Sequence, residues 1–253
     1  MKHLWSWISY SYKRTFALLF MLPLALCSGH RYMQIVEESE ARWLSIDGHI
    51  TNVTSVNGVR RMNNVMRADA CNSHGEDCIK DVLLIRGMIT VSTLFDLNQM
   101  FERHTTTTVC LDSPGGSGVI AWFISHWIAA KNLNTCMAAS YRLLDFPVKL
   151  SKAACFSACP FVLASGQQRI AVGYEHGDIQ TIGVHQGRIG LSLCLCDYTL
   201  ASGFHVPKLE LIMPSDRADF AQLFALSNKA TYDKIFPLQR NELDAVQMFT
   251  RWL

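Results

Sequence analysis

The sequence lacks a strong charge of either sign. Its 253 residues carry 23 Lys and Arg against 21 Asp and Glu, which gives a formal net charge of +2. This balance provides no electrostatic support for a polyanionic partner, because nucleic-acid binding depends on neutralising phosphates. The chain also lacks internal repeats and low-complexity tracts, and 49% of its residues are hydrophobic. We therefore expect a globular protein without a nucleic-acid partner.

Complete motifs for phosphate or metal are also missing. The stretch VCLDSPGGSG at 109–118 lacks the Gly-Lys-Ser/Thr ending of a phosphate-binding loop. Cys71, His74 and Cys78 offer metal ligands, but the second half of a zinc site is absent. We predict no cofactor and no metal, and a disulfide that joins Cys71 to Cys78.

The N-terminal apolar run is short for a membrane-spanning helix, which needs ~20 residues. This run, FALLFMLPLALC at 16–27, follows Lys2, Lys13 and Arg14. Positive residues before such a run are typical of an export signal, whereas a buried core helix is the alternative. Residues 1–29 are therefore predicted to be a signal peptide or an N-terminal membrane anchor.

Cysteine is abundant for a cytosolic protein. Apart from Cys27, an even number of cysteines remains, which in an exported chain indicates disulfides of open connectivity. They are Cys71, Cys78, Cys110, Cys136, Cys155, Cys159, Cys194 and Cys196.

The pattern along the chain changes near residue 80. Residues 30–79 are weakly patterned, and we interpret them as an N-terminal extension with short strands. After them, predicted strands alternate with predicted helices, which is typical of an α/β domain with helices covering a sheet. The strands are expected at 81–89, 107–111, 135–139, 170–172 and 182–184, the helices at 93–103, 119–131 and 161–164, an irregular stretch at 140–154 and a helical tail at 215–253.

Two glycines, Gly115 and Gly116, stand between a predicted strand and a predicted helix. Backbone N–H groups point outward at such a turn, and the helix dipole adds positive potential there. The turn could bind the transient oxyanion of an acyl transfer. The alternative is a tight turn that merely needs a positive φ.

Two further residues could take part in acyl transfer. Ser157 precedes a helical stretch, where it could cap the helix or act as a nucleophile with the N–H of Ala158 as an oxyanion donor. His185 ends a short apolar strand, and a histidine in that position is either structural or a general base.

Three segments in the same order resemble the Clp protease proteolytic subunit, ClpP, and the wider ClpP/crotonase superfamily. They are SPGGS at 113–117, SACPFVLASG at 157–166 and RIAVGYEHGDIQTIGVHQ at 169–186. The GMI at 87–89 resembles the strand that opens the family domain. The resemblance covers about residues 80–253, and it implies an α/β fold of repeated β-β-α units with helices flanking the sheet.

The resemblance also implies roles for these residues. Ser157 would be the nucleophile of a serine peptidase and His185 its general base. Gly116, or alternatively Gly115, would supply one oxyanion donor, and the Ala158 N–H the other. The implied partners are a peptide or protein substrate and further copies of the chain.

The third catalytic residue implied by the resemblance is an acid that orients the histidine. Asp233 lies at the matching distance from His185, and Asp216 and Asp219 are the alternatives. The cysteines on either side of Ser157 have no ClpP counterpart, and pairing Cys155 with Cys159 is one option for a bridge there.

The form Cys-x-Ser-Ala-Cys is similar to exported, ClpP-like bacterial proteins. This implies a periplasmic protein, or one anchored in the inner membrane through its N-terminal segment and facing the periplasm. Two other functions compete with an exported peptidase. One is a catalytically inactive binding or assembly module of the cell envelope, and the other is crotonase-like chemistry on a coenzyme A thioester. A Ser–Lys pair fits poorly, because Lys149 and Lys152 precede the serine.

Overall fold

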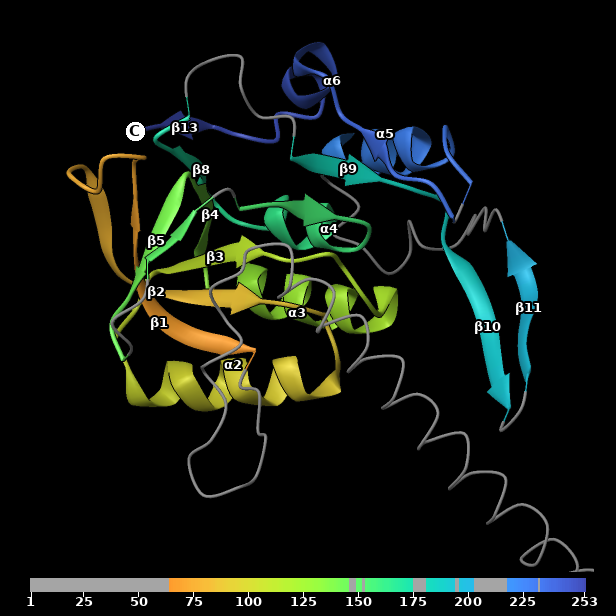
Figure 1. Cartoon of the computed structure of the whole chain (residues 1–253), viewed down its shortest axis with the longest axis horizontal. Coiled ribbons are helices and arrows are strands. Elements are labelled where there is room, and N and C mark those ends of the chain that lie inside the picture. The colour runs from red at the N-terminus through yellow and green to blue at the C-terminus, as the bar shows by residue number, and fades with distance from the viewer. Residues whose placement is uncertain are drawn as a thin grey trace, which may run out of the picture.

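The computed structural model describes residues 64–145, 149–151, 153–174, 181–193, 196–202, 218–231 and 233–253 (Figure 1). The predicted signal peptide or anchor at 1–29 lies outside the described residues, as does most of the predicted extension. Among the residues that are described, no helix combines the length and the apolar character needed to span a membrane.

An eight-stranded sheet forms the centre of the molecule. Its five strands from β13 to β2 run parallel, and β1, β5 and β6 continue it antiparallel at one edge. In spatial order the strands are β13 (Arg251–Trp252), β8 (Arg169–Val172), β4 (Asn134–Ala138), β3 (Thr108–Asp112), β2 (Cys78–Arg86), β1 (Val65–Cys71), β5 (Ser140–Leu143) and β6 (Lys149–Ser151).

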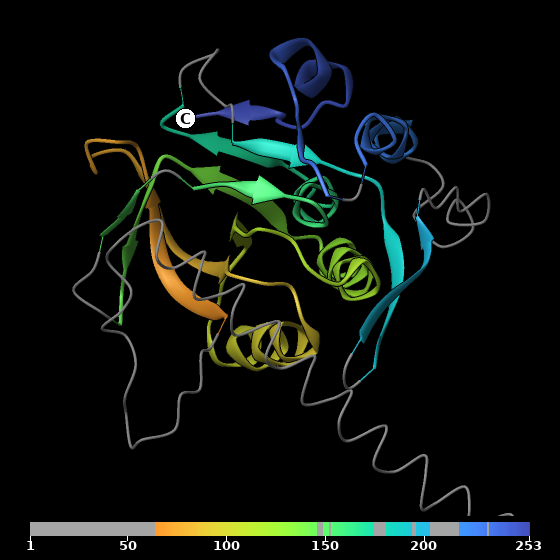
Figure 2. The ribbon, with the colours of Figure 1, turned by 45° about the vertical axis from the view of Figure 1, so that its right-hand side comes forward.

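The parallel part of the sheet is buried along its strands. Every residue of β3, β4 and β8 is buried except Asn134, as expected for parallel strands covered on both faces. Helices α2 (Val91–Arg103) and α3 (Gly118–Ala130) lie side by side in both ribbon views (Figures 1 and 2). These elements confirm the α/β class and the predicted order of strands and helices.

The stretch 140–154, predicted to be irregular, contains two strands among its described residues, so that prediction is wrong for them. Strands β5 and β6 form an antiparallel pair at the sheet edge. Tyr141 is buried, and its hydroxyl donates to the Leu111 carbonyl at 3.2 Å and accepts from the Ala138 N–H at 3.0 Å. The polar groups that suggested a loop are therefore satisfied inside the fold. The sheet also includes β1, which precedes the expected domain start at residue 80.

A second, three-stranded sheet carries the remaining core strands. Strand β9 (Ile182–Val184) pairs in parallel with β7 (Cys155–Phe156) and antiparallel with β12 (Phe236–Pro237). Helices α4 (Cys159–Leu163), α5 (Ala218–Ser227) and α6 (Arg240–Ala245) complete this part. The predicted helical tail is thus correct for α5 and α6 but wrong for the strands β12 and β13.

A separate hairpin follows β9. Strands β10 (Arg188–Leu193) and β11 (Cys196–Ser202) pair only with each other among the described strands. Both ribbon views show this hairpin away from the eight-stranded sheet (Figures 1 and 2).

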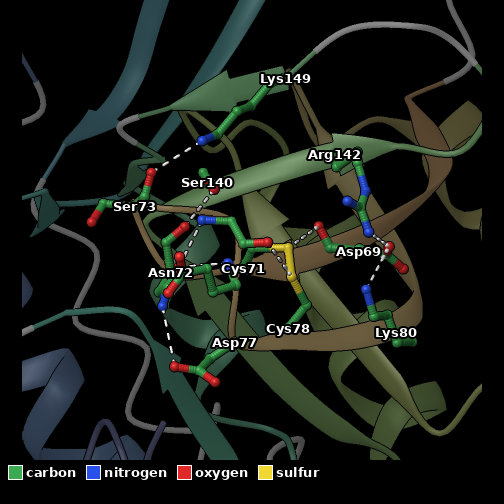
Figure 3. Close-up of a disulfide and its surroundings, with 12 residues drawn as sticks. Asp69, Cys71, Asn72, Ser73, Asp77, Cys78, Lys80, Ser140, Arg142 and Lys149 are labelled. Atoms are coloured by element: carbon green, nitrogen blue, oxygen red, sulfur yellow. Dashed lines mark hydrogen bonds and ion pairs between the residues drawn. A yellow bond between two sulfur atoms is a disulfide. The ribbon is translucent and has the colours of Figure 1, made fainter.

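Three disulfides join cysteines of the described residues. The predicted bridge between Cys71 and Cys78 is confirmed and closes the turn between β1 and β2. Figure 3 shows it beside Asp69, whose carboxylate bonds to Arg142 at 2.6 Å and to Lys80 at 3.3 Å. The other two bridges link Cys110 of β3 to Cys136 of β4, and Cys155 to Cys159. Cys194 lies outside the described residues.

Candidate active site

The turn after β3 lies between two backbone segments. On one side Ser113 bridges to Cys155, and the Phe156 N–H donates to the Ser113 carbonyl at 2.9 Å. On the other side Gly116 bridges to Ile89, and the Ile89 N–H donates to the Gly115 carbonyl at 2.7 Å. The turn is thus held between the segment that follows β2 and the β7 strand that leads to Ser157.

The direction of the Gly116 N–H follows from this pairing. No peptide bond in the described chain is cis. In a trans peptide the N–H points opposite to the preceding carbonyl. Because the Gly115 carbonyl faces Ile89, the Gly116 N–H faces the other side, where Ser113 pairs with β7. This is the side on which Ser157 lies.

Ser157 occupies a tight turn between β7 and α4. Its φ is +60°, a left-handed conformation that is costly for a residue with a Cβ atom. The position is fixed by a hydrogen bond from its N–H to the Gly183 carbonyl at 2.9 Å. Strained residues of this kind concentrate at functional sites, including nucleophiles placed on strand-to-helix turns.

The Ser157 hydroxyl does not cap a helix, so the capping interpretation is wrong. The N-cap of α4 is Ala158, with φ −78°, and no side chain bonds to it. Among the described residues the Ser157 hydroxyl has no hydrogen-bond partner, and the residue is only partly buried. It is therefore available to a bound molecule.

Gly115 is in very close contact with the serine turn. A Cβ atom at Gly115 would lie 2.5 Å from the Ser157 Cβ, 2.6 Å from the Phe156 carbonyl oxygen and 2.9 Å from the Ala158 nitrogen. Its φ is also positive, at +95°. Glycine is therefore required here for two reasons, because the backbone is left-handed and another backbone approaches closely.

Two backbone donors remain without an acceptor at this place. In the part of the chain that the structure describes, neither the Gly116 N–H nor the Ala158 N–H donates a hydrogen bond. The neighbouring N–H groups of Gly115, Phe156 and Ser157 all do. Buried or half-buried N–H groups are rarely unpaired, so two such donors beside one serine point to a site for an acceptor atom.

His185 directly follows β9, and Ser157 directly follows the neighbouring strand β7. Phe156 pairs with Gly183, so the two side chains come from the same ends of neighbouring parallel strands. The Nδ1 atom of His185 lies 2.7 Å from the Gln186 carbonyl oxygen. A carbonyl only accepts, so Nδ1 is assigned the proton, and Nε2 of the neutral ring is left as the base. The structure contains no hydrogen bond between His185 and Ser157.

Asp233 precedes strand β12, which pairs with the strand that ends before His185, but no hydrogen bond or ion pair joins these two described side chains. The β12–β9 ladder pairs Phe236 with Val184, which places the segment before β12 beside the residues that follow β9. The Asp233 carboxylate is exposed and accepts a hydrogen bond from the Thr231 hydroxyl at 2.5 Å, which lowers the pKa of Asp233. The side chains of the alternatives, Asp216 and Asp219, lie outside the described residues.

A buried ion pair below the turn was not predicted. Arg86 Nε lies 2.9 Å from Asp112 Oδ2, and both side chains are almost fully buried. The other carboxylate oxygen of Asp112 accepts from the Ala154 N–H at 3.0 Å. Asp112 thus connects β2, β3 and the approach to β7. The acidic residue at the end of an apolar strand could have indicated a buried charge. Its partner Arg86 could not be identified from the sequence, because it lies 26 residues away.

Ser113 supports the turn from within. Its hydroxyl donates to the Gly87 carbonyl at 2.6 Å and accepts from the Gly115 N–H at 3.0 Å. This arrangement fixes the glycine next to Ser157. Among the described residues no group of three His, Cys, Asp or Glu side chains gathers where it could hold a metal ion.

Comparison with known proteins gives structural likeness only. No family model matches the chain, and no curated protein matches it. Among solved structures, an alanine mutant of 1510-N, a membrane-bound stomatin-specific protease, is 15% identical with a TM-score of 0.41, covering 67% of this chain and 77% of that one. ClpP1 from Listeria monocytogenes is 11% identical with a TM-score of 0.41, covering 68% and 90%. The ClpP protease catalytic domain from Plasmodium falciparum is 11% identical with a TM-score of 0.38, covering 68% and 83%.

Proposed function

We propose that this protein is a serine peptidase in which Ser157 is the nucleophile and His185 the general base. The observation that carries the proposal is the environment of Ser157. Its hydroxyl lacks a partner among the described residues, and two unpaired N–H groups, of Gly116 and Ala158, flank it on a left-handed turn. A plain structural turn needs none of these features.

The geometry supports an acyl-transfer sequence. Ser157 Oγ attacks the carbonyl carbon of a peptide and forms a C–O bond, while its proton passes to Nε2 of His185. The negative charge that develops on the carbonyl oxygen is accepted by the N–H groups of Gly116 and Ala158. The C–N bond then breaks as the proton moves from Nε2 to the leaving amine. Water hydrolyses the resulting ester by the same route in reverse.

Asp233 is the proposed third member of this group. It would have to exchange the Thr231 hydroxyl for Nδ1 of His185, which bonds to the Gln186 carbonyl in this structure. Catalytic hydrogen bonds of ligand-free enzymes are often long or misaligned and form only with substrate bound. The ladder between β12 and β9 supports the proposal, because it keeps both segments adjacent.

The proposal includes export to an oxidising compartment, periplasmic or at the inner membrane, with residues 1–29 as signal or anchor. The three disulfides of the described residues support this, because such bonds persist outside the reducing cytosol. The substrate class is a peptide or protein, and we propose that the chain forms homo-oligomers.

An inactive binding module is the second candidate. The missing hydrogen bond between Ser157 and His185 favours it, as does the missing hydrogen bond between Asp233 and the histidine. In that case the turn at Ser157 would keep its conformation, but the protein would not hydrolyse peptides.

A fluorophosphonate probe distinguishes the two candidates, because it reacts only with an activated serine. We expect covalent labelling of the folded protein, loss of labelling in Ser157→Ala, and slowing by at least 100-fold in His185→Ala. Ser73→Ala, which changes an exposed serine in the β1–β2 turn, serves as the matched control and should be labelled at the normal rate. Labelling that persists in Ser157→Ala, or no labelling of the folded protein, would reject the peptidase.

A further inference from the structure

The disulfide between Cys155 and Cys159 encloses the proposed nucleophile. Cys155 lies in β7 and Cys159 is the first residue of α4, with a Cα–Cα distance of 5.2 Å. The three residues between them include Ser157 and the proposed oxyanion donor Ala158. Both cysteines are fully buried, so the bridge belongs to the core beneath the site.

The two sides of this turn are held differently. On the β7 side, the N–H groups of Phe156 and Ser157 donate to the carbonyls of Ser113 and Gly183 at 2.9 Å. On the α4 side the Ala158 N–H has no acceptor among the described residues, and α4 spans only residues 159–163. The disulfide adds a second covalent link between the two sides, beside the main chain itself.

The conformation inside the bridge is one that the chain would not adopt freely. Ser157 has a φ of +60°, and a residue with a Cβ atom returns readily to the right-handed or extended regions when constraints are removed. Glycine would relieve this cost but would remove the hydroxyl. Gly115 of the oxyanion turn packs closely against the same serine turn. A small rotation of Ser157 would therefore change the contact between the two turns.

We infer that the Cys155–Cys159 disulfide positions the nucleophile by holding Ser157 in its left-handed conformation, and that activity depends on its oxidation. The inference rests on the proposed peptidase function. The cysteines act as positioning residues, because they hold Ser157 and do not touch the substrate themselves. A dithiol would reduce the bridge by thiol–disulfide exchange, giving two thiols on the protein and the cyclic disulfide of the reductant.

The other bridges provide a control. Cys71–Cys78 also closes a short loop, but it lies in the turn between β1 and β2 (Figure 3). The double variant Cys71→Ala/Cys78→Ala therefore removes a disulfide and two cysteine side chains in the same way, but at a place away from the serine turn.

The test compares Cys155→Ala/Cys159→Ala with this control and with the wild type. We expect fluorophosphonate labelling to be at least tenfold slower in the Cys155/Cys159 variant, at a temperature where circular dichroism shows it folded, and unchanged in the control. NMR-detected hydrogen exchange of the Phe156 and Ser157 amides should accelerate at least tenfold in the same variant only.

Each outcome decides the inference. Amide exchange within twofold of the wild type would overturn it, as would an unchanged labelling rate in the folded Cys155/Cys159 variant. If the wild type itself is not labelled, the proposed function fails, whereas the exchange of the two amides still shows whether the disulfide holds the turn.

Discussion

Replacing Gly115 by alanine tests how closely the oxyanion turn and the serine turn are matched. The new Cβ would lie 2.5 Å from the Ser157 Cβ, 2.6 Å from the Phe156 carbonyl oxygen and 2.9 Å from the Ala158 nitrogen. Two of these atoms belong to backbone, so no side-chain rotation relieves the overlap. Overpacking of this kind costs about 1–3 kcal/mol, and a left-handed backbone at a residue with a Cβ costs about 1–2 kcal/mol more.

We therefore expect Gly115→Ala to lower the free energy of unfolding by about 2–5 kcal/mol. The easiest relief moves Ser157 and Ala158 away from Gly116, which removes one oxyanion donor. Such a loss is worth about 3–4 kcal/mol, or roughly a 100- to 1000-fold slower fluorophosphonate reaction. Urea unfolding and the labelling rate, measured on the same preparation, provide both numbers.

Gly118→Ala is the matched control for this experiment. It makes the same change three residues further on, where no atom lies within 4 Å of the new Cβ. Stability and labelling should stay at wild-type values or stability should rise slightly, because alanine favours helix over glycine. A Gly115→Ala protein that is as stable and as reactive as this control would refute the predicted contact between the two turns.

Three further predictions concern carboxylates. Asp112→Asn removes the carboxylate that faces the buried Arg86 guanidinium and should cost about 3–5 kcal/mol in urea unfolding, whereas Asp81→Asn, in the more exposed pair of Asp81 on β2 with Arg67 on β1, should cost about 1 kcal/mol or less; equal costs would contradict the larger contribution expected from the buried pair. Asp233→Asn should slow labelling by at least 100-fold while Thr231→Val does not, and a change below threefold would leave the Gln186 carbonyl as the group that orients the histidine. Burial alone would raise the pKa of Asp69, but hydrogen bonds from a guanidinium, a backbone N–H and an ammonium lower this pKa overall. The ionised carboxylate therefore contributes to the free energy of unfolding above about pH 4, and this contribution is lost as the pH falls further. The stability difference between wild type and Asp69→Asn should therefore shrink between pH 6 and pH 3, and a constant difference would exclude this linkage.

The strands around the site were predictable because buried strands appear in the sequence as short apolar runs. The strand at 182–184 has the bounds of β9, and the strand at 107–111 differs from β3 by one residue at each end. Buried parallel strands are apolar throughout, so they are recognisable without their neighbours. The edge strands β5 and β6 were missed, because their polar groups bond to distant residues such as Asn72 and Leu111.

The geometry of the site depended on contacts that are distant in sequence. A serine before a helix suggests a cap, but the φ of Ser157 is set by Gly183 and Ser113 across three strands. The pairing of Arg86 with Asp112 likewise follows from the register of β2 and β3. The residues Gly115, Ser157 and Ala158 were predictable as a group, whereas the contact distances between them required the sheet.

The structure of the fluorophosphonate adduct would show directly whether Ser157 is a nucleophile beside two oxyanion donors. We expect one phosphorus atom bonded to Ser157 Oγ, with the phosphoryl oxygen about 2.7–3.1 Å from the backbone nitrogens of both Gly116 and Ala158. This expectation would be contradicted by an adduct on another residue, or by a phosphoryl oxygen that accepts from neither nitrogen.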